Sequence, residues 1–132
     1  MIVIIIGVLA GVSFPFYHAA VSNNDLSIAT TTLAQSMRRA QAFSYAGEQD
    51  SAWGVKIEPG EIIVFAGDSY VARDTDYDQT TSINDNLTTS GLTEVVYSKT
   101  YALPQTTGTT TFESPVGAQK QVSINIKGMI TY

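Results

Sequence analysis

The sequence predicts an α+β protein in which one long N-terminal helix packs on an antiparallel β-sheet. Two observations predict this class. From Leu26 to Phe43, apolar residues recur at steps of three and four, which is the period of a helix. From residue 52 onward they alternate with polar residues instead, with the period of two that is typical of strands. A chain of 132 residues is long enough for one domain with one core.

The composition excludes several classes of function. The formal net charge is -5, and the seven Lys and Arg residues are scattered, so nucleic acid is not expected as a partner. Arg38 and Arg39 are adjacent, but two arginines facing an acidic domain are more typical of salt bridges or filament contacts. Cysteine is absent, which excludes disulfides, thiolate zinc sites and catalysis by a thiol.

The first element is an apolar segment whose only polar side chain, up to Phe16, is Ser13. It is shorter than the roughly 20 residues that span a bilayer, and it lacks the basic region of a signal peptide. Because it is apolar on every face, it fits lipid or a bundle of identical helices. A signal-peptide remnant and a buried core helix are the alternatives. We expect residues 1–21 to form a transmembrane or filament-core segment through Ile2, Ile4, Ile5, Ile6, Val8, Leu9, Phe14 and Pro15.

The helical pattern continues beyond this segment as a single apolar stripe. The stripe predicts helix-to-sheet packing and consists of Leu26, Ala29, Leu33, Met37, Ala40 and Phe43. Gly47 is a plausible helix stop. The simplest prediction is one helix over residues 2–46, about 65 Å long and bent near Pro15, where proline removes a backbone donor. Its second half, residues 22–46, belongs with the β-sheet of residues 52–132 to a globular head, residues 22–132.

The strands follow the helix. Residues 52–66 predict a hairpin that turns at Pro59-Gly60, because alternating apolar residues lie on both sides of this turn signal. Residues 67–91 are polar and predict a long loop. Further strands are predicted at residues 93–97, 109–112, 122–126 and 129–132.

No residue pattern indicates catalysis, and we expect neither an enzyme nor a cofactor. His18 is the only histidine, and it follows the apolar segment, where a role in packing or at a membrane interface is favoured over a metal ligand. The serines lack the G-x-S-x-G pattern of a nucleophile elbow. Trp53 begins a predicted strand and is expected to pack in the core rather than to serve as a ligand platform.

One acidic pattern matches part of a calcium loop. Its candidate ligands are Asp74, Asp76, Asp78 and Asp85. Carboxylates at alternate positions with a distal acid are typical of calcium loops. However, Gln79 occupies the position that requires glycine, and no helices flank the segment. A solvated acidic loop is therefore the favoured interpretation, and calcium is the alternative.

The sequence resembles the type IV pilin-like proteins, the type IV pilins and the pseudopilins of type II secretion. MIVIIIGVLAGVSFP is similar to the inner part of their N-terminal helix, where an isoleucine-rich run leads to a helix-bending proline. The likeness continues at residues 33–50, 53–57, 62–78 and 101–104 and in the closing SINIKGMITY. It is greatest to the minor pseudopilins of the H/FimT type.

This resemblance implies a pilin fold, a long bent helix packed on an antiparallel sheet. It implies a minor pilin or pseudopilin that is anchored in the bacterial inner membrane by a single span, with its head in the periplasm or outside. The subunit would then enter an envelope filament by helix–helix packing and act in protein secretion or pilus assembly. The implied partners are other pilin or pseudopilin subunits, the inner membrane, and a secretion or pilus assembly platform.

Two features of the family are not in the given sequence. A basic leader ending in glycine and a glutamate just inside the mature N-terminus would both fall before Met1. We therefore expect Met1 to be an internal methionine or a truncated start. Two alternative functions stay open. One is a FimT-like DNA-uptake or adhesive pilus component, and the other is a membrane-anchored β-rich binding domain that does not polymerise.

Overall fold

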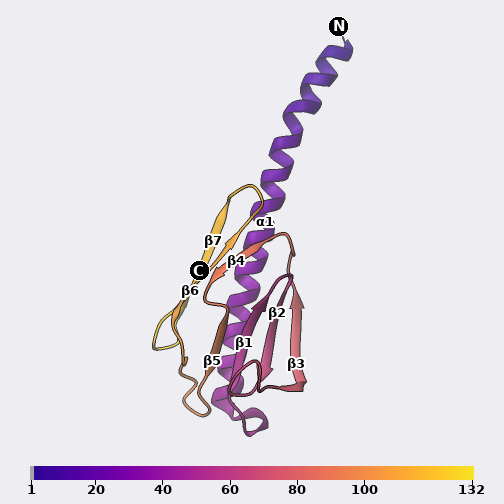
Figure 1. Cartoon of the computed structure of the whole chain (residues 1–132). Helices are drawn as coiled ribbons and strands as arrows, with labels where there is room; N and C mark the ends of the chain where they lie inside the picture. Colours follow the sequence, from indigo (N-terminus) through magenta and orange to yellow (C-terminus); the bar gives the residue numbers. More distant parts are fainter. Residues whose placement is uncertain (1) are drawn as a thin grey trace.

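A computed structural model describes the backbone from Ile2 to Tyr132 and the side chains from Asn23 onward (Figure 1). The described residues form one long helix, a short 3-10 turn and eight strands. The helical elements are α1 (Ile2–Ala46) and η1 (Glu48–Asp50). The strands are β1 (Trp53–Glu58), β2 (Glu61–Ala66), β3 (Asp74–Ser82), β4 (Thr88–Gly91), β5 (Glu94–Tyr97), β6 (Gly108–Glu113), β7 (Gln119–Ile124) and β8 (Ile130–Thr131).

The strands form two antiparallel sheets of four strands each within the described chain. The first sheet has the order β3-β2-β1-β5 and the second has the order β4-β6-β7-β8. The α+β class is therefore confirmed, whereas the prediction of one sheet is wrong. After β3 the chain crosses to the second sheet for β4, returns to the first for β5, and crosses again for β6. These crossings connect the two sheets covalently within one head. The alternation of apolar and polar residues along the sequence does not show to which sheet a strand belongs.

The helix is the element that joins the two sheets. It contacts β1, β2 and β5 of the first sheet and β6, β7 and β8 of the second. Figure 1 shows α1 running along the head, with β1 to β3 on one side and β6 and β7 on the other. The inward positions of the strands alternate with period two, so one core cluster draws side chains from α1 and from both sheets. This cluster is the common core of the head.

The first sheet also buries residues on the face that points away from α1. Ala52, Phe65 and Val96 form a second cluster there, and Tyr70 packs against it with its ring centroid 5.6 Å from that of Phe65. Gly54 makes this packing possible, because a Cβ at Gly54 would lie 2.6 Å from Cζ of Phe65. The β2–β3 connection, residues 67–73, thus covers part of the outer face of the sheet.

The prediction of a loop over residues 67–91 is wrong, because β3 and β4 lie within it. β3 is an edge strand whose residues are exposed or half-buried throughout. Such a strand has no buried side chains with which to produce an alternating apolar pattern. The hairpin predicted over residues 52–66 is confirmed as β1 and β2.

Some predictions concern side chains outside the described residues. These are the packing of the apolar segment through Ile2, Ile4, Ile5, Ile6, Val8, Leu9, Phe14 and Pro15, the bend at Pro15, and the environment of His18. In the part of α1 whose side chains are described, no stretch has the length and apolarity needed to cross a membrane.

Candidate functional site

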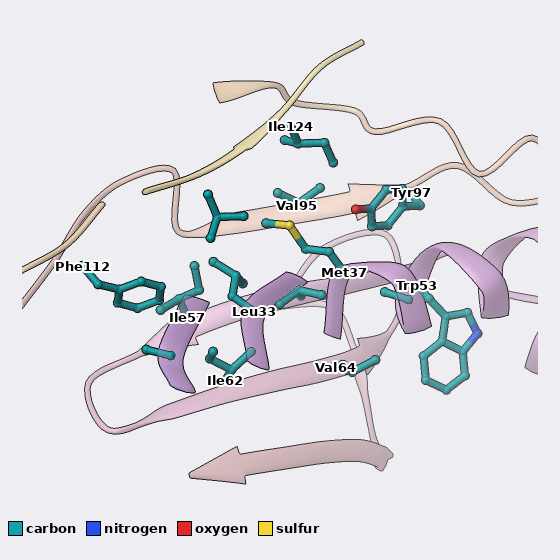
Figure 2. Close-up of a cluster of buried hydrophobic side chains, with 14 of the residues drawn as sticks. Leu33, Met37, Trp53, Ile57, Ile62, Val64, Val95, Tyr97, Phe112 and Ile124 are labelled. Carbon is teal, nitrogen blue, oxygen red and sulfur yellow. The ribbon is translucent and has the colours of Figure 1, made fainter. Parts of the chain in front are cut away.

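The predicted helix stripe lies against both sheets. Leu26, Ala29, Leu33, Met37 and Ala40 are almost completely buried in the common core, and Phe43 packs at its edge. Figure 2 shows Leu33 and Met37 among side chains of both sheets, including Ile62 and Val64 of β2, Val95 of β5 and Ile124 of β7. The spacing of three and four residues keeps the stripe on one face of α1, so each turn of the described helix contributes to the same core. The stripe therefore makes α1 the central element of the head.

Ser44 ties the last turn of α1 to the first sheet. Its side chain is fully buried, and its Oγ accepts a hydrogen bond of 2.8 Å from the backbone N–H of Trp53. The same hydroxyl can donate its one proton to either of two carbonyl oxygens. That of Tyr97 lies at 3.2 Å and that of Trp53 at 3.4 Å. Gly47 then ends the helix in a left-handed conformation at φ 70°. This tie fixes the end of α1 against β1 and β5.

Tyr97 places a buried polar atom in the common core. Among the described side chains, its hydroxyl is the buried polar group for which no hydrogen-bond partner is found. Burial raises the pKa of the Tyr97 phenol well above its usual range, because the phenolate would be desolvated. Tyr97 is an unusual core residue, since most buried polar groups are paired.

The carboxylates of the predicted calcium pattern do not form a loop. Asp74, Asp76 and Asp78 lie along β3, and Asp85 lies in the turn that follows, beside Gly60. In an extended strand, alternate residues are about 6.5–7 Å apart along the chain, so they do not wrap round one ion. Within the part of the chain with described side chains, no group of three acidic, histidine or cysteine residues could hold a metal.

Asp78 has a different role, because it binds Arg73. Nε of Arg73 lies 2.9 and 3.1 Å from the two carboxylate oxygens of Asp78, and Nη1 donates to the carbonyl oxygen of Tyr70. The Arg73 guanidinium also lies 3.9 Å from the centroid of the Tyr70 ring. The hydrogen bond with Asp78 raises the pKa of Arg73, because it favours the charged guanidinium. A cation here rests on a tyrosine ring and is neutralised by a carboxylate.

A surface hollow of about 310 Å³ lies between the end of α1 and β3. We call it the Trp53 hollow. Its aromatic part consists of Phe43, Trp53 and Tyr77, and its polar part includes Glu48, Asp76 and Gln79. The Phe43 and Trp53 rings are 4.8 Å apart, and Tyr77 meets Trp53 edge-on at 6.5 Å. Trp53 is only 3% exposed and Tyr77 is 38% exposed, so Trp53 forms the floor and Tyr77 a wall.

Local backbone irregularities shape this hollow. The pairing of β2 with β3 shifts register between Val64 and Ala66, and the irregular part of β3 carries Tyr77. Such bulges re-aim side chains and are frequent beside functional sites. On the opposite side, Gln49 and Asp50 have left-handed φ values of 56° and 53°, which are uncommon for residues other than glycine. The hollow is thus made by two irregular segments that meet at Trp53.

Sequence reasoning placed Trp53 in the core, where it lies, but it did not identify the hollow. Tyr77 was not distinguished from the other residues of the expected loop. Its Asp-Tyr-Asp context was the available signal, because an aromatic residue between acids in a polar stretch is a candidate contact residue. The register shift that turns Tyr77 toward Trp53 has no sequence signature.

The two adjacent arginines take part in weaker contacts than the expected salt bridges. Arg38 lies over the ring of Tyr132 at 5.5 Å, and Nη1 of Arg39 donates to Oε1 of Gln79 at 3.2 Å. The ion pairs found among the described residues are Arg73–Asp78 and Lys99–Asp50. Arg39 therefore lies at the rim of the Trp53 hollow, through its bond to Gln79.

Two features thus stand out: a helix stripe built for packing, and an aromatic hollow with carboxylates at its edge. Neither contains a nucleophile paired with a base, which acyl transfer and related chemistry require. The arrangement can pack and bind. In comparisons with known proteins, no protein family, no curated protein and no solved structure matches the chain.

Proposed function

We propose that this protein is a structural subunit of an envelope filament, a minor pilin or pseudopilin that acts in type II secretion or in pilus assembly. The observation that carries the proposal is the division of α1. The helix begins at Ile2, the first buried residue among its described side chains is Leu26, and from Leu26 it serves as the central element of the head. The head alone does not require a helix of this length, so the first half of α1 is expected to serve another purpose.

The composition of the first half supports this assignment. Residues 1–16 are apolar on all sides of a helix, which suits lipid or a bundle of equivalent helices. The segment first anchors the monomer in the membrane. It then packs against the helices of neighbouring subunits in the filament, where burial of apolar surface favours assembly. The head is carried on the filament surface by the second half of the helix.

Two substitutions in α1 test this division. Leu33→Asp places a charge in the common core and is expected to unfold the head, because a buried unpaired charge is very costly. Ile4→Asp places the same charge in the apolar segment and is expected to block membrane anchoring and filament assembly while the head stays folded. Circular dichroism and Trp53 fluorescence report folding, and membrane fractionation and electron microscopy of filaments report anchoring and assembly.

Thr31→Asp is the matched control, since Thr31 is an exposed residue of the same helix. It should preserve the folded head and membrane anchoring. The proposal is wrong if Ile4→Asp and Leu33→Asp have the same effect, or if Ile4→Asp leaves anchoring and assembly intact. Membrane anchoring without any filament in the wild-type protein would instead favour the non-polymerising binding domain.

A further inference from the structure

We propose that the Trp53 hollow binds a lysine or arginine side chain presented by a partner protein. This inference rests on the described head alone and does not depend on the filament proposal. The size of the hollow fits a single side chain. At about 310 Å³ the hollow is at the small end of ligand sites, so it suits one side chain better than a larger molecule.

The charge at the hollow favours a cation. Glu48 and Asp76 line it, and neither belongs to an ion pair among the described residues. Asp74 lies beside Tyr77 in an adjoining hollow of about 330 Å³ and is also without an ion pair there. Asp78 also lines the hollow but is paired with Arg73, and Asp50 of the adjoining hollow is paired with Lys99. The third cation nearby is Arg39, at the rim, and its hydrogen bond goes to the neutral Gln79. The five carboxylates of the two hollows therefore outnumber these three cations, and the excess of negative charge attracts a positive group.

The head itself shows the binding mode that we propose. Arg73 rests on the Tyr70 ring at 3.9 Å and pairs with Asp78, so that a tyrosine face and a carboxylate hold one guanidinium together. Tyr77 and Asp76, which both line the Trp53 hollow, are residues of the same two types. Among the described residues, the tyrosine rings that carry a cation are those of Tyr70 and Tyr132, and Tyr77 is free to receive one.

The buried Trp53 makes the site rigid and gives it an optical signal. Its Nε1–H donates to the carbonyl oxygen of Glu48 at 2.9 Å, which fixes the indole beneath the hollow. Because Trp53 is the only tryptophan of the chain, its fluorescence reports on this place and on no other. A cation bound beside the indole should change the emission.

The experiment titrates the full chain, in non-ionic detergent, with four blocked tripeptides that differ in the central residue. The acetylated and amidated peptides are Gly-Arg-Gly, Gly-Lys-Gly, Gly-Gln-Gly and Gly-Glu-Gly. We expect a saturable change in Trp53 emission with the arginine and lysine peptides, and none with the glutamine and glutamate peptides. Because the attraction is between charges near the surface, the affinity should fall as salt is added.

Variants locate the site. Tyr77→Ala, Asp76→Asn and Glu48→Gln should each lower the affinity for the arginine peptide about two- to five-fold, as expected for exposed cation–π and ionic contacts. Arg39→Gln, which removes the cation at the rim, should raise the affinity. Asp85→Asn is the matched control, because it removes an exposed carboxylate outside the hollow and should leave the affinity unchanged. Circular dichroism confirms that each variant is folded.

Four results would overturn the proposal. They are an unsaturable titration with both cationic peptides, equal affinity for the glutamine peptide, unchanged affinity in the folded Tyr77→Ala and Asp76→Asn variants, and an equal loss in Asp85→Asn. The last result would mean that the peptides respond to the net charge of the head and not to the hollow.

Discussion

At the scale of single residues, Ser44 shows how one hydroxyl can connect three elements. The fully buried hydroxyl accepts a hydrogen bond from the backbone N–H of Trp53 and lies within hydrogen-bond distance of two carbonyl oxygens. No feature of the sequence around Ser44 predicts that its hydroxyl connects α1 with β1 and β5. Only the approach of β1 and β5 to the end of α1 makes the hydroxyl part of the core.

Ser44→Ala should therefore lower the free energy of unfolding by about 1–3 kcal/mol, because it leaves buried backbone groups without their partner. Urea denaturation followed by Trp53 fluorescence measures the change. Thr31→Ala, at an exposed helical position, should alter the stability by no more than about 0.5 kcal/mol. Equal stability of Ser44→Ala and the wild-type protein would contradict the assigned role of the hydroxyl.

Tyr97 is the opposite case, a buried hydroxyl without a partner among the described residues. Tyr97→Phe removes the unpaired group and keeps the ring, so we expect the free energy of unfolding at neutral pH to rise by about 1 kcal/mol. Thermal and urea unfolding measure this difference. A loss of stability in Tyr97→Phe would show that the hydroxyl is bonded in solution.

The pH dependence follows from the raised pKa of Tyr97. The folded head disfavours the phenolate, whereas the unfolded chain ionises Tyr97 at the ordinary tyrosine pKa of about 10. The free energy of unfolding is therefore unaffected by this group below pH 10 and falls as the pH rises above it. The wild-type protein should lose stability above pH 10 more steeply than Tyr97→Phe. In an absorbance titration, the Tyr97 phenol should ionise only when the head unfolds.

At the scale of elements, the helix was predictable, whereas the edge strands β3 and β4 were not. The stripe from Leu26 to Phe43 follows the helical period because every member meets the same core. The residues of β3 meet solvent on both faces, so nothing in their order distinguishes a strand from a loop. Hydrophobic periodicity detects elements that bury a face, and β3 is held by backbone pairing with β2 instead.

Two substitutions in α1 separate burial from helix formation. Leu33→Ala should lower the free energy of unfolding by about 2–5 kcal/mol, since it removes methyl and methylene groups from a fully buried place. Ile28→Ala changes a side chain that is 48% exposed on the same helix and should cost less than about 1 kcal/mol. Similar losses in the two variants would mean that the stripe does not face the core as described.

At the scale of the whole molecule, the contacts of the head come from the described part of α1 and from the two sheets. Among the side chains described from Asn23 onward, the common core begins at Leu26, and we expect the head to fold without the preceding segment. We expect a chain of residues 23–132 to retain the near-ultraviolet spectrum and the melting temperature of the full chain, within a few degrees. An unfolded or aggregated fragment would show that residues 1–22 are part of the fold of the head.

The sequence by itself determined the α+β class, the end of the helix near Gly47, the packing stripe and the first hairpin. These features come from the burial of one face of a local element, and local order in the chain records such burial. Only the tertiary structure decided that the strands divide into two sheets, that Ser44 ties three elements, and that Tyr77 turns toward Trp53 to form a hollow. Each of these features depends on contacts between segments that are distant in the sequence. Such contacts leave no recognisable pattern within either segment alone.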